Sequence, residues 1–220
     1  MPCLDECGTV GGCTDEALSF MARHDLSGEV IVADNGSTDG SAYIAAKHGA
    51  VVINVRKKGY GRAVRAGIRH SRGAVIIIAD SDSTYDLAAL ESFYYPLAQS
   101  RADVMIGDRF AGGIEPGAMP LVHIPGILML SALGNIFFST DIHDHHCGIR
   151  ALTRRAASVM QTRTTGMEFA AEFIAEAKRR RLRIGETPAV LRKCRSGRRS
   201  KLRTFRDGMR HLIYIIGSGK

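Results

Sequence analysis

The sequence has no CxxC pair, no internal repeat and no low-complexity tract. Its cysteines number five, an odd count without paired spacing. This pattern disfavours a disulfide framework and a structural zinc site, and it favours reduced thiols in the cytosol. A signal-peptide core is also missing, because Asp5 and Glu6 interrupt the amino-terminal region. With 220 residues, of which 45% are hydrophobic, the chain is expected to form one globular cytoplasmic domain.

Residues 116–140 contain no Asp, Glu, Lys or Arg. This stretch is long enough to raise the question of a membrane span. Pro120, Pro125 and Gly126 interrupt its first half, and Ser131 and Asn135 make the rest partly polar. These residues favour a helix at the membrane surface or in the protein core over a helix that crosses the bilayer.

Basic residues are concentrated near the carboxyl end of the chain. The net charge is +8, and residues 178–210 contain 14 of the 30 lysines and arginines but only two of the 22 acids. Such a segment attracts anions, which include nucleic acid, an anionic membrane face and phosphorylated substrates. A solvated helix face explains the bases at 178–181 but not those from 192 onward, where Ser196 and Gly197 indicate a loop.

Short apolar runs alternate with helical patterns in the first half of the chain. They predict strands over 29–33, 50–55, 74–79 and 103–106, separated by helices over 41–48, 61–71 and 87–99. This succession predicts an α/β fold in which a mainly parallel sheet carries helices on both faces. After Gly107 the rhythm changes, and we expect extended segments over 147–153 and 182–193 with helices over 169–181 and 204–216.

Two carboxylates follow the most apolar of these strands. Asp80 and Asp82 come directly after residues 75–79, at the edge where parallel α/β sheets bind ligands. Carboxylates with this alternate spacing can bind Mg²⁺ or Mn²⁺ through oxygen, and such ions complete their shell with substrate phosphates. The alternative is a capped loop, because Ser83 or Asp86 can cap a helix that begins near residue 87.

A second polar turn follows the strand at 29–33. Asp34 occupies the same place in the sheet as Asp80, one βαβ unit earlier, and Gly36 permits a tight turn. A carboxylate there can accept hydrogen bonds from a base or a ribose. Residues 37–39 can cap the next helix, so a plain capped loop explains the turn equally well.

Bases and glycines open the following helix. Lys58, Gly59 and Gly61 suit the close approach of a diphosphate to the backbone. They also match part of a dinucleotide-binding fingerprint, with Asp80 about twenty residues farther on. That match is weak, because Val64 occupies the third glycine position.

Taken in order, these motifs resemble the family 2 glycosyltransferases of the GT-A fold, in particular the polyprenyl- and dolichyl-phosphate mannose or glucose synthases. The resemblance covers essentially the whole chain and rests on residues 2–6, 34–40, 58–61, 65–67, 80–82, 107–110, 148–150, 166–169, 186–188 and 197–201, with Asp144 and Glu172. It implies one Rossmann-like GT-A domain over 1–220, with a nucleotide-sugar half over 1–110 and an acceptor half over 111–220. In such domains a strand precedes the motif at Pro2, so this first strand is expected to be missing. Asp5 and Asn35 depart from the family pattern, which has Asn and Asp there.

The resemblance also implies roles for single residues. Contacts with the nucleotide-sugar are assigned to Pro2, Leu4, Glu6, Asp34, Gly36, Lys58, Gly61, Asp80 and Ser81, and binding of Mg²⁺ or Mn²⁺ to Asp80 and Asp82. Catalytic roles are assigned to Asp82, Arg109, Asp144, Arg198 and Lys201, whose basic members would align the donor and acceptor phosphates. Asp144 would act as a base only if the acceptor were a hydroxyl.

The expected reaction is a metal-dependent, inverting transfer of a sugar from a UDP- or GDP-sugar to a polyprenyl phosphate. A phosphate monoester is largely dianionic at neutral pH and needs no strong base. The expected partners are the sugar donor, the lipid phosphate and an anionic membrane surface, with the protein peripheral at the cytoplasmic face and no nucleic acid bound. The oligomeric state stays open.

Three alternatives remain: transfer to a hydroxyl acceptor, a sugar-phosphate nucleotidyltransferase, and a non-catalytic membrane- or RNA-binding relative. A nucleotidyltransferase should carry a glycine- and lysine-rich triphosphate loop after its first strand, which the sequence lacks. A binding module would tolerate the loss of Asp80 and Asp82. His143, His145 and His146 do not indicate a metal site, because neighbouring residues on a strand point to opposite faces.

Overall fold

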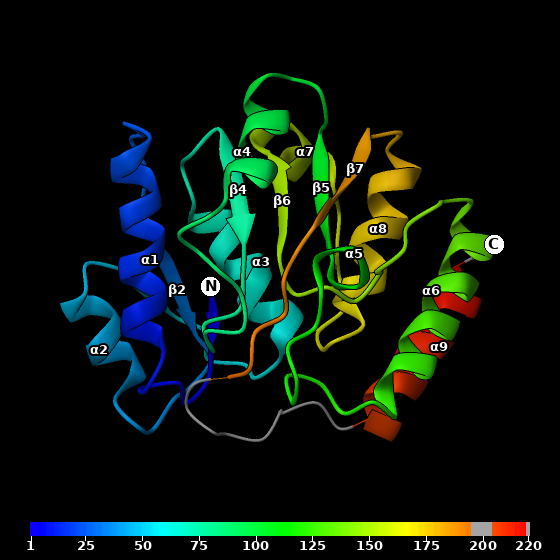
Figure 1. Ribbon diagram of the computed structural model, residues 1–220, viewed down its shortest axis with the longest axis horizontal. Coiled ribbons are helices and arrows are strands. Elements are labelled where there is room, and N and C mark those ends of the chain that lie inside the picture. The colour runs from blue at the N-terminus through cyan, green and yellow to red at the C-terminus, as the bar shows by residue number, and fades with distance from the viewer. Residues whose placement is uncertain (195–203, 219–220) are drawn as a thin grey trace.

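The computed structural model describes residues 1–194 and 204–218, and its strands form the centre of the molecule with helices around them (Figure 1). The strands are β1 (Pro2–Cys3), β2 (Ile31–Asp34), β3 (Val51–Asn54), β4 (Val75–Ile78), β5 (Val104–Asp108), β6 (Arg150–Thr153) and β7 (Ile184–Pro188). The helices are α1 (Val10–Arg23), α2 (Ser41–Lys47), α3 (Tyr60–His70), α4 (Glu91–Ala98), α5 (Arg109–Gly112), α6 (His123–Phe138), α7 (Arg154–Val159), α8 (Phe169–Arg179) and α9 (Thr204–Ser218).

The described strands form two sheets. One has the order β1-β2-β3 and is parallel throughout, with Pro2 opposite Ala33 and Ile31 opposite Val51. The other has the order β4-β6-β5-β7, in which β6 runs antiparallel to both neighbours and β5 runs parallel to β7. The predicted α/β fold with a mainly parallel sheet and flanking helices is thereby confirmed, with β6 as the antiparallel exception.

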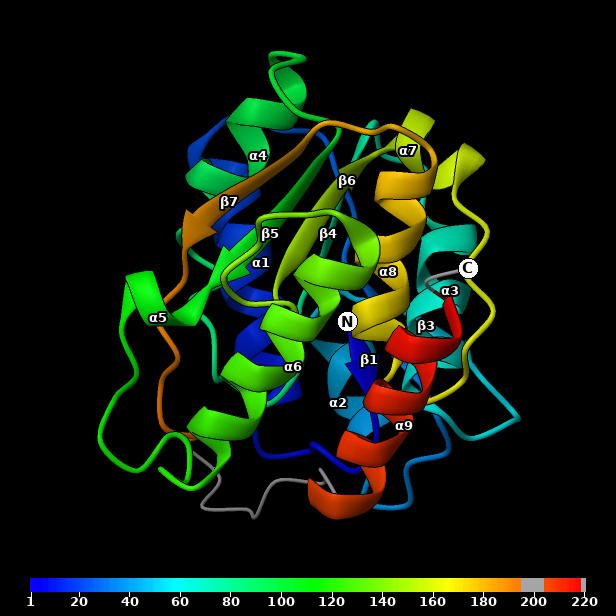
Figure 2. The ribbon, with the colours of Figure 1, turned by 90° about the vertical axis from the view of Figure 1, so that its right-hand side faces the viewer.

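The sheets are covered by helices at both ends of the molecule. Helices α1 and α2 pack beside the three-stranded sheet, whereas α6 and α9 lie side by side at the opposite end of the long axis (Figure 1; Figure 2). Between them, α8 contacts both α6 and α9. The loop between β2 and α2 and the long apolar helix predicted over 116–140, found as α6, therefore belong to different ends of the protein.

Apolar side chains of the strands and of α8 form the main core. Val104 and Ile106 of β5 are completely buried, and Phe169 and Phe173 of α8 pack against the same cluster. β-Branched and aromatic residues fill this layer because both faces of the central strands are covered.

Some elements differ from the sequence prediction. Helix α1 was not predicted, because two glycines and a threonine among its first five residues obscure the helical pattern. Helix α4 begins at Glu91 instead of 87, since the carboxylates of Asp86 and Glu16 accept hydrogen bonds from the Ala88 and Leu87 amides and hold that segment in a turn.

Strand β1 is only two residues long. It pairs with β2, while β4 heads the second sheet, so the described strands leave an interruption between the two sheets. The first strand of the family was expected to be missing, and the structure has the two-residue strand Pro2–Cys3 beside β2.

Candidate functional site

The turn after β2 is fixed by side-chain hydrogen bonds. Asp34 is buried, and its carboxylate accepts hydrogen bonds from the amides of Gly36 and Ser37, each at 3.3 Å. The Asp5 carboxylate accepts one from the amide of Thr38 at 2.7 Å, and the Glu6 amide donates to Ser41 Oγ at 2.7 Å. The loop after β1 and the loop after β2 therefore form one preorganised wall.

Asn35 connects this wall to the basic loop. Its amide nitrogen donates to the carbonyl oxygens of Val55 and Lys57, and its carbonyl oxygen accepts from the Gly59 amide at 2.6 Å. Lys58 is exposed, and a Cβ at Gly36 would lie 3.7 Å from its Cε. Asp34, Gly36 and Lys58, predicted to contact the nucleotide-sugar, are thus brought together.

Gly59 and Gly61 have a structural reason for lacking a side chain. A Cβ at Gly59 would lie 2.2 Å from the Thr165 carbonyl oxygen, and one at Gly61 would lie 2.6 Å from that of Thr164. Gly59 also has a φ of 144°, and the Gly61 amide donates to Thr165 O at 3.1 Å. The backbone of residues 164–165 occupies the space that the sequence pattern suggested for a diphosphate.

The acidic motif lies at the carboxyl end of β4. Burial and the neighbouring Asp82 raise the pKa of Asp80 to about 7, a shift that the Tyr60 hydroxyl opposes. Asp82 Oδ1 accepts hydrogen bonds from the amide and hydroxyl of Thr84 at 3.1 and 2.6 Å. A Cβ at Gly148 would lie 2.3 Å from Asp80 Oδ2, so only glycine allows that loop to approach the carboxylate.

Ser81 joins the motif to the amino-terminal segment. Its hydroxyl donates to the Pro2 carbonyl oxygen at 2.9 Å, and its own carbonyl oxygen accepts from Thr9 Oγ1 at 2.8 Å. Ser81 is buried, so it positions the residues on either side of it rather than facing solvent. Pro2, Leu4 and Glu6 consequently lie on the segment that borders the motif.

Arg109, directly after β5, and Asp144 form a buried ion pair. Arg109 Nε and Nη2 donate to the two carboxylate oxygens at 2.5 and 2.8 Å, and the Arg109 amide donates to Oδ2 at 3.3 Å. Asp144 is completely buried and Arg109 nearly so, and the carboxylate raises the pKa of the guanidinium. Asp144 thus orients Arg109 in a bidentate geometry.

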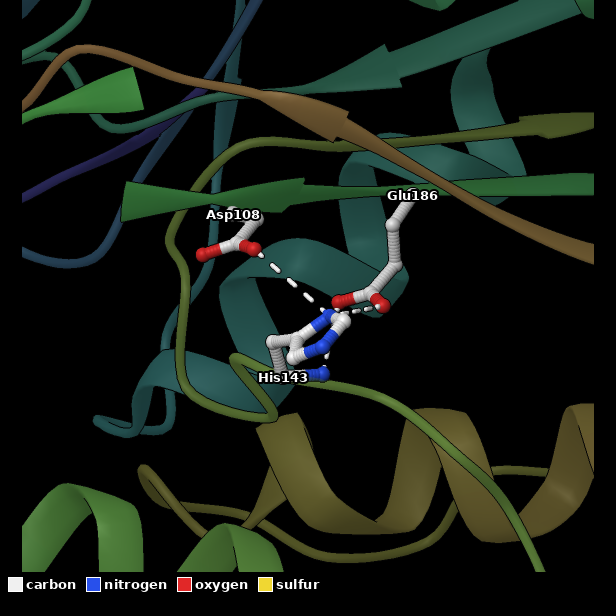
Figure 3. A group of neighbouring side chains, drawn as sticks. All are labelled: Asp108, His143 and Glu186. Carbon is white, nitrogen blue, oxygen red and sulfur yellow. Dashed lines mark hydrogen bonds and ion pairs between the residues drawn. The ribbon is translucent and has the colours of Figure 1, made fainter. Parts of the chain in front are cut away.

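A group that sequence reasoning missed lies beside this pair: Asp108, His143 and Glu186 converge from β5, a loop and β7 (Figure 3). Their ligand atoms lie within 4.8 Å of one another, a spacing that a divalent cation can bridge. Glu186 already accepts from His143 Nδ1 at 3.0 Å and raises the pKa of that imidazole, while Asp108 Oδ1 caps α5. Hydrogen bonds therefore already satisfy most polar atoms of this group. Asp108 and Glu186 both belong to the ordered sequence motifs, and this was the signal that could have found the group.

His145 and His146 lie in a turn. The sequence-based argument that they lie on a strand and point to opposite faces is therefore wrong. His145 Nε2 hydrogen-bonds to Asn135 Oδ1 at 2.8 Å, and His146 packs edge-on against His211 of α9 with ring centroids 4.5 Å apart. His145 is buried against α6, and His146 is half-buried against α9.

The basic carboxyl-terminal segment passes beside the acidic motif at Arg192 and Cys194. The Arg192 amide donates to Thr84 O at 2.8 Å, and Cys194 Sγ lies 3.2 Å from the carbonyl oxygen of Asp82. Arg198 and Lys201, which were predicted to handle phosphates, lie outside the described residues.

Helix α6 carries much of the exposed apolar surface. Leu121 and Val122, just before it, are 80% and 79% exposed, and Ile136 on it is 73% exposed. On the adjacent α9, Ile213 is 64% exposed. Nowhere in the described part of the chain is a helix both long and apolar enough to cross a membrane.

The fold matches those of solved glycosyltransferases. Glucosyl-3-phosphoglycerate synthase from Mycobacterium tuberculosis, in complex with Mn²⁺, UDP and glucosyl-3-phosphoglycerate, superposes with a TM-score of 0.73 and 20% identity over 99% of this chain and 77% of that one. Mannosyl-3-phosphoglycerate synthase from Rubrobacter xylanophilus superposes with a TM-score of 0.69 and 19% identity over 99% and 70%. The architecture is that of a GT-A glycosyltransferase.

The chain belongs to glycosyl transferase family 2, because residues 1–160 match the sequence model of that family. It is 37% identical to the low-salt glycan biosynthesis hexosyltransferase Agl6 of Haloferax volcanii over 98% of this chain and 52% of that protein. It is 33% identical to the dolichyl-phosphate hexose transferase of the same organism over 82% of this chain and 76% of that protein. The chain thus spans about half the length of Agl6.

Proposed function

We propose that this protein transfers a hexose from a nucleoside-diphosphate sugar to a polyprenyl phosphate. The observation that carries the proposal is the linkage of two acidic loops: Ser81, between Asp80 and Asp82, is bonded to Pro2, and the segment that follows Pro2 is bonded to the turn after Asp34. The same chain holds a buried, preoriented Arg109. The similarity to a dolichyl-phosphate hexose transferase supports a lipid phosphate as acceptor.

Asp80 and Asp82 are proposed to hold a divalent cation, Mg²⁺ or Mn²⁺. Burial beside the Asp82 carboxylate raises the pKa of Asp80, because the charged form of Asp80 is disfavoured there. A cation bound by both carboxylates would offset this cost. No third His, Cys, Asp or Glu among the described residues joins them in a group tight enough to hold an ion, so donor phosphates would complete its shell. The bound cation would neutralise the charge that develops on the departing nucleoside diphosphate.

In the transfer, an acceptor phosphate oxygen forms a bond to the anomeric carbon while the bond to the donor diphosphate breaks, which inverts that carbon. The acceptor oxygen is already ionised at neutral pH, so no residue has to remove a proton. Arg109, held in place by Asp144, is proposed to align a phosphate. The ion pair suits Asp144 to positioning Arg109 better than to acting as a base.

Arg198 and Lys201 are proposed to contact the acceptor phosphate. The support is the position of Cys194, which brings the chain leading to them next to Asp82. Replacing both bases with Ala is expected to raise the lipid-phosphate concentration needed for half-maximal rate about tenfold, with little change in the free energy of unfolding. An unchanged acceptor requirement would reassign them to general attraction for anionic surfaces.

The exposed residues of α6 and α9 are proposed to rest on the membrane surface from which the lipid is taken. Leu121, Val122 and Ile136 of or beside α6 and Ile213 of α9 would enter the boundary between head groups and acyl chains. The cationic character of residues 178–210 would add attraction to anionic lipids at this face.

The test measures transfer of radiolabelled hexose from UDP- and GDP-sugars to dolichyl phosphate. With Mn²⁺ present, Asp82→Ala should reduce turnover at least ~100-fold, because the cation loses one oxygen ligand. The circular dichroism spectrum should stay unchanged, because the substitution does not alter the apolar strand before Asp82. Asp15→Ala, at an exposed carboxylate on α1, is the matched control and should keep full activity. Full turnover by Asp82→Ala, or in excess chelator, would contradict the proposal.

A further inference from the structure

The imidazole of His143 faces two carboxylates, Asp108 at the end of β5 and Glu186 on β7 (Figure 3). His143 Nδ1 lies 3.0 Å from Glu186 Oε2 and 3.7 Å from Asp108 Oδ2. The longer distance exceeds that of a hydrogen bond. Across residues 1–194 and 204–218, this is the one place where three His, Cys, Asp or Glu side chains bring their ligand atoms within 4.8 Å of one another.

Each of the two carboxylates is held by backbone amides through one oxygen only. Asp108 Oδ1 accepts hydrogen bonds from two amides of α5 at 2.8 and 3.1 Å. Glu186 Oε1 accepts one from the His143 amide at 2.8 Å and a longer one from the Asp144 amide at 3.4 Å. The other oxygen of each carboxylate is the one that faces the imidazole. Outer hydrogen bonds of this kind orient the ligands of metal sites, so these side chains are oriented for a common ligand.

The two carboxylates are poorly compensated in charge. The side chains of Asp108 and Glu186 are only 8% and 17% exposed, whereas that of His143 is 72% exposed. Among the described residues, His143 is the one basic side chain that forms an ion pair with either of them. Charged groups of low exposure are normally paired or bound to a metal ion. A divalent cation between them would compensate both charges, and the exposed side of the group leaves room for a water ligand.

The separations of the ligand atoms suit a single metal ion. An ion that binds imidazole and carboxylate at about 2.0–2.2 Å holds neighbouring ligands about 3.0–3.6 Å apart at octahedral or tetrahedral angles. The separations from His143 Nδ1 are 3.0 and 3.7 Å, so small side-chain movements bring all three atoms to an ion. The nitrogen ligand favours Zn²⁺ over Mg²⁺, which prefers oxygen ligands and keeps several waters.

We propose that Asp108 Oδ2, His143 Nδ1 and Glu186 Oε2 bind one Zn²⁺ ion, with water in its remaining position. The ion replaces the hydrogen bond between His143 and Glu186, and the amide hydrogen bonds to the outer oxygens remain. The bound imidazole is neutral, with its proton on Nε2. This site is separate from the cation proposed for Asp80 and Asp82, and it does not depend on the proposed transfer reaction.

A bound ion would join three segments that are distant in the sequence. They are β5, β7 and the loop between α6 and β6. Two of the ligands, Asp108 and His143, directly precede Arg109 and Asp144, which form the buried ion pair. The ion would therefore fix the backbone on both sides of that pair, which gives the site a positioning role.

Zinc titration of the Asp82→Ala protein, followed by calorimetry, measures this site without the proposed donor cation. It should bind one ion per chain, and adding His143→Ala or Glu186→Gln should weaken binding at least ~100-fold, the upper end of the cost of losing an outer-shell partner. His48→Ala is the matched control, because His48 lies 2.9 Å from the single carboxylate of Asp15, and it should leave the affinity unchanged. Equal affinities of the His143→Ala and His48→Ala proteins would overturn the proposal, and the same comparison with Asp82 intact does not depend on how Asp82→Ala folds.

The second test locates the ion through its effect on stability and exchange. Zn²⁺ at ~100 times its dissociation constant should raise the midpoint of thermal unfolding by ~5 °C or more, because only the folded chain brings the three ligands together. Hydrogen exchange of residues 141–146 should slow at least ~10-fold, while that of residues 35–40 stays constant. Equal protection of both loops, or the same midpoint shift in His143→Ala, would overturn the site. Equal protection of residues 141–146 by Mg²⁺ would overturn the choice of Zn²⁺.

Discussion

The wall around Asp34, which is the proposed donor side, and the helices α6 and α9, which are the proposed acceptor side, hold their side chains in different ways. Around Asp34, Asn35 and Asp5, side chains are tied to backbone amides and carbonyls by hydrogen bonds of 2.6 to 3.3 Å. Around α6 and α9, apolar side chains are exposed, while the buried His146 Nε2 and His211 Nδ1 have no hydrogen-bond partner in the described structure. A fixed wall suits a polar ligand of defined shape, whereas an apolar surface suits a lipid that binds through area.

The largest effect should follow from breaking the buried ion pair of Arg109 and Asp144. Asp144→Ala leaves Arg109 buried and unpaired, which should lower the free energy of unfolding by about 3–5 kcal/mol. Urea denaturation measures this loss. The control Asp103→Ala removes the partner of Arg183, a side chain that is 55% exposed, and should cost no more than about 1 kcal/mol. Equal losses would show that the Arg109–Asp144 pair contributes no more to the free energy of unfolding than a surface ion pair does.

Acidification should destabilise the fold through His211 of α9, whereas the raised pKa of Asp80 makes protonation of that carboxyl stabilising over the same pH range. Burial lowers the pKa of His211 to about 4, whereas the unfolded chain takes up the proton near pH 6.5. The unfolded state therefore binds more protons between these values, and stability is lost as pH falls through this range, by about 2 kcal/mol at pH 5 for this one group. His146, Glu168, Asp207 and Arg210 surround the imidazole, so His211→Phe should flatten the dependence only in part.

The measurement is the urea midpoint at pH 7, 6 and 5. His48→Phe, at a partly exposed histidine on the donor side, is the control and should leave the slope as it is. A pH dependence that is identical with and without His211 would place the acid sensitivity elsewhere.

Asn35→Ala should loosen the donor-side wall. It removes the three hydrogen bonds that the buried Asn35 makes to Val55, Lys57 and Gly59, at a cost of about 1–3 kcal/mol in total. Donor affinity should fall ~10-fold while the acceptor requirement stays constant, as measured by nucleotide titration and by acceptor kinetics. Asn54→Ala, at an exposed position at the end of β3, is the control. A loss of acceptor affinity equal to that of donor affinity would erase the distinction between the two ends.

The smallest change in stability should come from the exposed apolar residues. Leu121→Ser with Val122→Ser should shift the free energy of unfolding by less than about 0.5 kcal/mol, because both side chains already lie in water. Binding to vesicles of phosphatidylcholine and phosphatidylglycerol, measured by co-sedimentation, should nevertheless drop several-fold. Tyr43→Ser alters a residue that is 71% exposed on the donor side and should leave vesicle binding intact. If the double variant binds vesicles as well as the unchanged protein does, α6 does not contact the membrane surface.

Much of the fold could be predicted from local patterns. The apolar run at β4 and the alternation of strands and helices through β5 depend on neighbouring residues, so periodicity reveals them. Helix α1 escaped prediction because its glycines hide the pattern, and the antiparallel direction of β6 depends on its pairing with β4 and β5, which lie more than 40 residues away. Local propensity carries no information about such pairings.

Sequence by itself determined the family, the order of the motifs and the acidic pair Asp80 and Asp82, because these depend on residue identity and spacing along the chain. Only the tertiary structure decided that Asp144 holds Arg109, that Thr165 fills the space beside Gly59, and that Asp108, His143 and Glu186 converge. The physical reason is the same in each case: a contact between distant segments is set by how strands pair and helices pack, and several arrangements are compatible with one local pattern.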